Sequence, residues 1–380
     1  MLRIHGGKVL TRGALVDAAI DIDDGCIAAV GAEAGPGRCL DAQGLLVLPG
    51  IVDIHGDAFE RQLMPRPGVG FATPIGLKDS DRQAISNGIT TVFHGVTASW
   101  EPGLRSIDNA RAILESLEAL RPSLAADTRL HLRYEAYNLD AEAEVADWLS
   151  ERRIDMLAFN DHMPGPNTPR RARKLAEMAE RATMPIEDFT ALIERLRARA
   201  DAVPATTTRL AAVARDNLIP MLSHDDVSPE QRRSFRALGC RVAEFPTTIA
   251  TAEEASSAGD DIVLGAPNIV RGGSHIGWVN AADMIGRGLC TILASDYYYP
   301  APLLAGFRLV ADGIATIGEA WTYVAEQPAR AAALPDRGQF EVGRRADVIL
   351  VEANDLQHPK VVATIAAGRL VHLTDATRLH

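Results

Sequence analysis

Histidine and carboxylate residues end five separate apolar runs of this 380-residue chain. They are His55 and Asp57, Glu135, Asp161 and His162, His224 with Asp225 and Asp226, and Asp296. Imidazole and carboxylate groups, without thiolates, are ligands that zinc, manganese, iron(II) and nickel accept. His55 and Asp57 are two residues apart on an extended segment, so both side chains point to the same side and can chelate one ion. The pattern indicates a metal site, and the alternative is a polar cluster that binds no ion.

Eight apolar, β-branched runs of the chain explain how these residues could meet. The runs are 51–55, 89–96, 129–135, 154–161, 218–224, 241–246, 261–267 and 291–296, with helical stretches between them. Near-continuous apolar strands covered by helices are typical of a parallel sheet that is buried on both faces. Eight such units over residues 49–337 predict an α/β fold, a (β/α)8 TIM-like barrel. Because the active sites of such barrels lie at the C-terminal strand ends, we expect the metal-binding residues at one mouth.

The two ends of the chain have a different pattern from the middle. Residues 1–48 and 338–380 contain short apolar runs separated by glycine turns, which predict strands. Neither segment is long enough to form a good core alone, so we expect both termini to build one small β-sandwich domain. Residues 167–216 are longer than one connecting helix requires, and their periodic Leu, Ala and Met with many charges predict an insertion of two or three solvated helices.

Charge and composition narrow the classes of partner and the location. The chain has 39 Lys and Arg against 50 Asp and Glu, a net charge of −11, which argues against nucleic acid and anionic membranes as partners. A small anionic substrate stays compatible with a locally basic pocket. The chain lacks the run of about 18 apolar residues that would predict a membrane span, and Asp17 and Asp21 argue against a signal peptide. The scattered Cys26, Cys39, Cys240 and Cys290 then favour a cytoplasmic protein with free thiols, and a homodimer is a fair expectation.

Several motifs resemble those of a known superfamily. DAQGLLVLPGIVDIHGD, at 41–57, resembles the segment that leads into the barrel of the amidohydrolase superfamily, where the usual first motif is HxH. GRRADVILVE, followed by AAGRLVH, is similar to the return of those chains to their small β domain. The motifs PRPG, SNGITTV, SHDD, AEFPTT, GAPNIVRGGSH and SDYYYP are similar to the phosphonate-degradation branch of that superfamily. The resemblance covers essentially the whole chain.

This resemblance implies a metal site and a reaction. One or two divalent ions are expected, most readily zinc, with manganese, iron and nickel as the other choices. The implied ligands, with Glu135 in the bridging position, are His55, Asp57, Glu135, His162, His224 and Asp296. Asp296 would also be the catalytic residue that accepts the proton of the attacking water. The implied reaction releases pyrophosphate from α-D-ribose 1-methylphosphonate 5-triphosphate in phosphonate catabolism.

A phosphorylated substrate requires cationic and N–H donors around the reacting phosphoryl group. The loop Arg271-Gly272-Gly273-Ser274, followed by His275, is the expected site, because Arg offers a bidentate fork and glycines let backbone N–H groups approach a phosphate. The alternative is an ordinary glycine turn. Arg66 and Arg133 are further anion-binding candidates. Asp225 is expected to support His224 as an outer hydrogen-bond partner.

Two other functions stay open at this point. The same barrel and metal site would serve a hydrolase of a C–N bond, such as a cyclic amide or imide hydrolase, a deaminase or a sugar-phosphate deacetylase. A metal-free barrel without catalytic activity is the third hypothesis, and metal content after purification would distinguish it from the other two.

Overall fold

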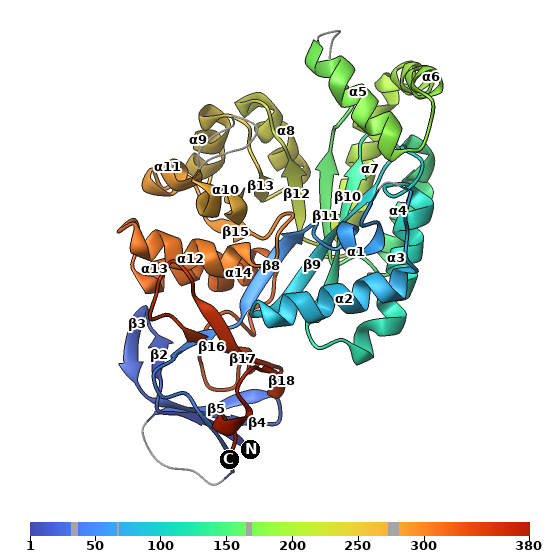
Figure 1. Ribbon diagram of the computed structural model, residues 1–380. Helices are drawn as coiled ribbons and strands as arrows, with labels where there is room; N and C mark the ends of the chain where they lie inside the picture. Colours follow the sequence, from blue (N-terminus) through green and yellow to red (C-terminus); the bar gives the residue numbers. More distant parts are fainter. Residues whose placement is uncertain (32–36, 67, 165–168, 273–280) are drawn as a thin grey trace.

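Eight parallel strands form the central sheet of the protein (Figure 1). The computed structural model describes the chain apart from residues 32–36, 67, 165–168 and 273–280. The strands follow one another around the sheet in sequence order: β8 (Ile51–Gly56), β9 (Ile89–Ala98), β10 (Asp127–Glu135), β11 (Met156–Asn160), β12 (Met221–His224), β13 (Val242–Glu244), β14 (Asp261–Gly265) and β15 (Ile292–Ala294). A parallel bridge between Gly56 and Asp296 joins the two edges. The predicted (β/α)8 barrel is therefore confirmed.

Apolar side chains fill the inside of this barrel and the layer between strands and helices. Val52, Ile54, Phe93, Met156 and Leu222 belong to one buried interior cluster. Further helices follow the strands and cover the outside: α1 (Glu60–Leu63), α2 (Thr73–Ser86), α3 (Ile107–Leu120), α4 (Glu142–Ser150), α7 (Val203–Asp216), α8 (Pro229–Leu238), α9 (Ile249–Ser257), α10 (Ala266–Arg271), α11 (Ala281–Gly286), α12 (Ala301–Ala311), α13 (Ile317–Trp321) and α14 (Gln327–Ala331). The buried strands are thus shielded on both faces, as their composition requires.

A two-layer β-sandwich lies below the barrel in Figure 1 and contains strands from both termini. One sheet has the order β5-β4-β1-β6, with β1 (Leu2–His5), β4 (Ala19–Asp23), β5 (Cys26–Gly31) and β6 (Arg38–Asp41). The other has the order β18-β17-β16-β7-β2-β3, with β2 (Lys8–Thr11), β3 (Ala14–Asp17), β7 (Leu46–Pro49), β16 (Val348–Glu352), β17 (Lys360–Ala366) and β18 (Arg369–Leu373). Residues from both sheets, including Ile20, Leu40 and Val348, share one core. The predicted sandwich is confirmed.

Two helices, α5 (Pro169–Arg181) and α6 (Ile186–Arg197), stand outside the regular ring at one rim of the barrel (Figure 1). The third helix of the predicted insertion, α7, instead contacts α4 and β12 and takes a regular place in the ring. The inserted pair is not only solvated, because Met178, Phe189 and Ile193 are buried in a core of its own. Trp100, from the loop after β9, packs against that core and fastens the pair to the barrel.

The four cysteines have the free thiols that were expected. Cys26, Cys39, Cys240 and Cys290 are all unpaired. Across the described part of the chain, every helix is too short or too polar to cross a bilayer.

Candidate active site

Strand ends bring His55, Asp57 and Asp296 together at one mouth of the barrel. His55 lies in β8, Asp57 follows it, and Asp296 follows β15, the strand that closes the barrel against β8. The backbone N–H of Asp57 donates to the carbonyl of Asp296 at 2.7 Å, and that of Asp296 donates to the carbonyl of His55 at 3.0 Å. One ligand atom from each side chain lies within 4.8 Å of the other two. These three residues form the first ligand group.

His162, His224 and Asp225 form a second ligand group of the same size. The Nε2 atom of His162 lies 3.5 Å from Asp225 Oδ2, and Nε2 of His224 lies 3.6 Å from Asp225 Oδ1. Asp225 was predicted as an outer partner of His224, and its carboxylate here faces the two nitrogen atoms that could bind an ion. Its left-handed φ of 59° and the φ of 54° at Asp296 place strained backbone at both carboxylates, as is common at functional sites.

Glu135 lies next to these groups but belongs to neither in the structure. Its Oε1 atom is 2.5 Å from Nδ1 of His162, and its Oε2 accepts the backbone N–H of His162 at 3.1 Å. The carboxylate therefore holds the imidazole from the side opposite Nε2. The bridging role expected for Glu135 stays a prediction.

Glu244 is a site residue that the sequence analysis did not include. It ends β13 and is completely buried, with Oε1 at 2.7 Å from Nδ1 of His55 and Oε2 at 2.7 Å from Nδ1 of His224. Because an ionised carboxylate only accepts hydrogen bonds, both imidazoles donate an N–H from Nδ1, and Nε2 is the nitrogen that can bind a metal ion once it carries no proton. A signal was available in the sequence, since Glu244 is the carboxylate within the predicted strand run 241–246, as Glu135 is within 129–135.

Buried charges surround these histidines. Burial opposes a charged His55 imidazole, but the carboxylates of Glu244 and Asp57 outweigh that effect and raise its pKa to about 10. Burial also opposes ionisation of Asp57, yet Arg133 and His55 hold its pKa well below its usual range. For Asp296 burial dominates, and it raises the pKa of this carboxyl to about 6. The mouth therefore combines one carboxyl group whose pKa is lowered, Asp57, with one whose pKa is raised, Asp296.

Arg133 lies between the two ligand groups and is itself buried. Its Nη1 atom donates to Asp57 Oδ2 at 2.8 Å, and its Nη2 atom lies 3.0 Å from His224 Nε2. The predicted anion-binding candidate is thus at the centre of the site. The guanidinium must leave Nε2 of His224 before that nitrogen can bind an ion.

The donor set fits a divalent transition metal. Asp57 Oδ1 is buried without a hydrogen-bond partner among the described residues, and it lies 3.5 Å from His55 Nε2. Nε2 of His162 and of His224 converge on Asp225 in the same manner. Nitrogen and carboxylate oxygen ligands without sulfur suit zinc, manganese, iron and nickel. A further buried trio, His55, His131 and Glu244, already uses atoms in hydrogen bonds, since His131 Nδ1 bonds the carbonyl of Ile54.

A cavity of about 200 Å³ opens from these residues toward helix α5. Its inner wall contains residues of the metal site, and its outer wall comes from the loop after β9 and from α5. The lining residues are Asp57, Thr97, Glu101, Arg105, Arg133, Glu135, His162, Lys174, Glu177, Met178 and Arg181. The cavity therefore joins the ligand groups to the inserted helix.

Arg133 lines this cavity, but the other described residues that were predicted to bind phosphate, Arg66, Arg271 and Gly272, do not. Arg271 is exposed at the end of α10, and its Nη1 lies 3.4 Å from the hydroxyl of Tyr297. Gly272 follows with a left-handed φ of 77°. Gly273, Ser274 and His275 lie outside the described residues, so the phosphate-binding loop stays a prediction. Arg66 is exposed in a bridge to Val69.

His94 is a buried histidine of the barrel that belongs to none of the ligand groups found among the described residues. Its ring packs against Phe59 at a centroid distance of 4.8 Å, and burial lowers its pKa to about 4. These contacts support a structural role for His94, as a neutral imidazole packed inside the barrel.

Comparison with known proteins gives a relative that matches the chain along most of its length. The chain is 30% identical over 366 residues to the alpha-D-ribose 1-methylphosphonate 5-triphosphate diphosphatase of Escherichia coli (strain K12), covering 93% of this chain and 95% of that enzyme. A segment of 53 residues is 43% identical to an allantoinase of Solibacter usitatus (strain Ellin6076), covering 14% of this chain and 12% of that protein. No family model matches the chain.

Solved structures of hydantoinase type have the same fold. A D-hydantoinase from Bacillus sp. AR9 superposes with a TM-score of 0.66 at 13% identity, covering 98% of this chain and 95% of that one. The dihydropyrimidinase from Brevibacillus agri NCHU1002 has a TM-score of 0.62 at 14% identity, with 98% of this chain and 95% of the other covered. At these identities the likeness concerns the fold alone.

Proposed function

The chain belongs to the amidohydrolase superfamily, in the family of the Escherichia coli diphosphatase, and we propose that it releases pyrophosphate from α-D-ribose 1-methylphosphonate 5-triphosphate. It is a hydrolase of that superfamily, and the proposal concerns its substrate. The observation that supports it best is the identity of 30% along 93% of the chain, which extends over the barrel and both termini. The cavity between the ligand groups and a helix that bears Lys174 and Arg181 adds a physical reason for an anionic substrate.

The residues proposed to hold divalent ions are the two ligand groups at the barrel mouth. His55, Asp57 and Asp296 would hold one ion, and His162, His224 and Asp225 would hold a second. When bound, such an ion supplies a deprotonated water near neutral pH and a Lewis acid for phosphoryl oxygens. Zinc is the first choice for these nitrogen and oxygen donors, and manganese, iron and nickel are the others.

The side chains of the chain then have distinct roles in the proposed reaction. Asp296 accepts the proton of the attacking water, whose oxygen bonds to the phosphorus next to the ribose. The bond from that phosphorus to the bridging oxygen breaks, and Asp296 returns the proton to the departing pyrophosphate. Arg133 faces the cavity and stabilises the negative charge that spreads over the phosphoryl oxygens.

Phosphorus NMR on metal-reconstituted protein tests this function. We expect ribose 1-methylphosphonate 5-triphosphate to give pyrophosphate and the 5-phosphate, and we expect a chelator to stop the reaction. Simple nucleoside triphosphates serve as the control for ribose phosphonate specificity. Protein that holds its metal but releases no pyrophosphate would overturn the proposal, and cyclic amides and N-acyl sugars would then be the substrates to test.

A further inference from the structure

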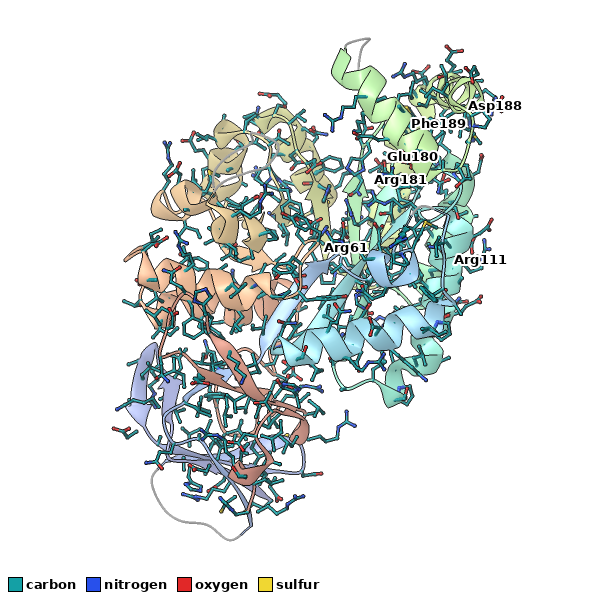
Figure 2. The ribbon with its side chains drawn as sticks, viewed as in Figure 1. Arg61, Arg111, Glu180, Arg181, Asp188 and Phe189 are labelled. Atoms are coloured by element: carbon teal, nitrogen blue, oxygen red, sulfur yellow. The ribbon has the colours of Figure 1, made fainter. Side chains whose placement is uncertain are left out.

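The outer wall of the cavity is a firmly built part of the molecule. Helix α5 supplies Lys174, Glu177, Met178 and Arg181 to that wall. Met178 is also buried in the core that α5 shares with α6. Arg181, at the barrel end of α5 in Figure 2, donates to the buried Glu101 at 2.6 Å. Apolar packing and a salt bridge thus fix the position of the helix over the cavity.

Three of the four Lys and Arg side chains that line the cavity are already paired with carboxylates. Arg133 pairs with Asp57 at 2.8 Å, Arg105 pairs with Glu60 at 2.9 Å, and Arg181 pairs with Glu101. These pairs order the wall, and each paired guanidinium adds less net positive charge for a ligand than an unpaired cation would.

Lys174 differs from these arginines. Its side chain is exposed, and among the described residues no carboxylate lies within salt-bridge distance of its ammonium group. The neighbouring Glu177 is engaged by Arg173, with Nε at 2.8 Å from Oε1. Lys174 therefore brings to this cavity a positive charge that no described carboxylate contacts directly, while its field also reaches the carboxyl of Asp161, and the other end of the cavity holds the metal ligands.

We infer that Lys174 and the wall of α5 form an anion subsite for the terminal phosphates of the substrate. A flexible ammonium group is a strongly hydrated point charge that suits a phosphate chain. The cavity of about 200 Å³ is small for a whole substrate, since ligand sites commonly measure about 300–1,000 Å³, and it has room for part of a phosphate chain. This inference rests on the proposed function. It assigns to helix α5 the selectivity of the enzyme for a polyphosphate substrate.

The direct test measures binding without turnover. Calorimetric titration of metal-reconstituted protein with magnesium-saturated inorganic tripolyphosphate should show a Kd that is weakened about tenfold or more in Lys174→Ala, because one charge-assisted contact is lost. Lys174→Arg keeps the charge and should retain binding within a few-fold. Lys360→Ala removes another exposed lysine, from β17 in the sandwich, and should bind like the unaltered protein. Because Lys174 is exposed, all three variants should keep the melting temperature of the unaltered protein.

The outcomes separate this inference from the proposed function. Equal tripolyphosphate affinity in Lys174→Ala and the unaltered protein would overturn the inference, even if pyrophosphate is released from the ribose substrate. A Lys174-dependent affinity together with no hydrolysis of that substrate would support the anion subsite and overturn the proposed function. Absence of tripolyphosphate binding in the unaltered protein would overturn the subsite as well.

Discussion

Glu244 connects the two ligand groups at the scale of single residues. One carboxylate accepts from Nδ1 of His55 and from Nδ1 of His224, so a single side chain sets the tautomer of one histidine in each group. Partners of this kind fix the ring orientation and the basicity of metal-binding imidazoles. Glu244 is therefore a positioning residue whose replacement should act on metal affinity.

Glu244→Gln tests that role with almost no change of shape. The amide has a single acceptor oxygen, so one of the two histidines faces an NH2 group and must carry its proton on Nε2, where it can no longer bind metal. Loss of such an outer partner typically costs about 10- to 100-fold in metal affinity. Competition with a chromogenic chelator measures the Kd, and Glu253→Gln, an exposed residue of α9, is the matched control. Equal metal affinity in both variants would contradict the assignment.

Asp296→Asn tests the proton acceptor. The amide keeps an oxygen near His55 and Asp57 but cannot take a proton from water, so metal content should stay and pyrophosphate release should fall by about 10²- to 10⁴-fold. Metal analysis and phosphorus NMR on the same preparation provide both readouts. Near-normal turnover in this variant would exclude Asp296 as the proton acceptor.

Metal uptake should be strongly pH-dependent. In the metal-free protein, nearby carboxylates outweigh burial and raise the pKa of His55 to about 10 and that of His162 to about 9, so both imidazoles are protonated at neutral pH. A metal ion must displace these protons, and lower pH strengthens the competition. Each ligand group contains one of these protonated imidazoles, so each ion displaces one proton and the affinity of each group should fall about tenfold for each pH unit below neutrality.

Calorimetry in buffers of different ionisation enthalpy counts the displaced protons directly. We expect about two protons for the two groups together at pH 7. A metal affinity that stays constant between pH 6 and pH 8 would show that neither imidazole carries a displaceable proton.

At the scale of elements, local sequence pattern was a good guide to the barrel and a poorer guide to the insertion. All eight predicted runs contain a strand, because burial on both faces leaves near-continuous apolar sequence. The charges of 167–216 predicted solvated helices, yet Met178 and Phe189 form a core with residues distant in sequence. The local sequence pattern does not distinguish a helix face that is buried against another inserted helix from a helix face that packs on the barrel.

Helix α13 packs tightly against the hairpin of β2 and β3. A Cβ atom on Gly318 would lie 2.2 Å from the carbonyl oxygen of Gly13, which is backbone and cannot rotate away. Gly318→Ala should therefore lower the free energy of unfolding by about 1–3 kcal/mol, as overpacking does. Gly286→Ala, in α11, adds a methyl group with no atom within 4 Å and should leave stability equal or slightly higher. Chemical unfolding compares the two, and equal midpoints would refute the predicted clash.

At the scale of the whole molecule, the two ends of the chain depend on each other. Strand β7 pairs in parallel with β2 and antiparallel with β16, so the six-stranded sheet needs strands from both termini. The whole molecule has a net charge of −11, whereas the cavity is lined by four Lys and Arg side chains and four Asp and Glu side chains. Net charge therefore describes the whole surface of the protein, whereas a substrate in the cavity experiences the electrostatic field of the residues around it.

The sequence by itself determined the barrel, the sandwich and the types of residue at the barrel mouth. These follow from local pattern, because strand periodicity needs only neighbouring residues and the C-terminal ends of parallel strands always share one side. The tertiary structure alone decided which groups touch. Glu244 lies 189 residues from His55 and 20 from His224, and Lys174 reaches the cavity only because α5 folds back over it. Such partnerships depend on strand register and side-chain packing in three dimensions, which no local pattern specifies.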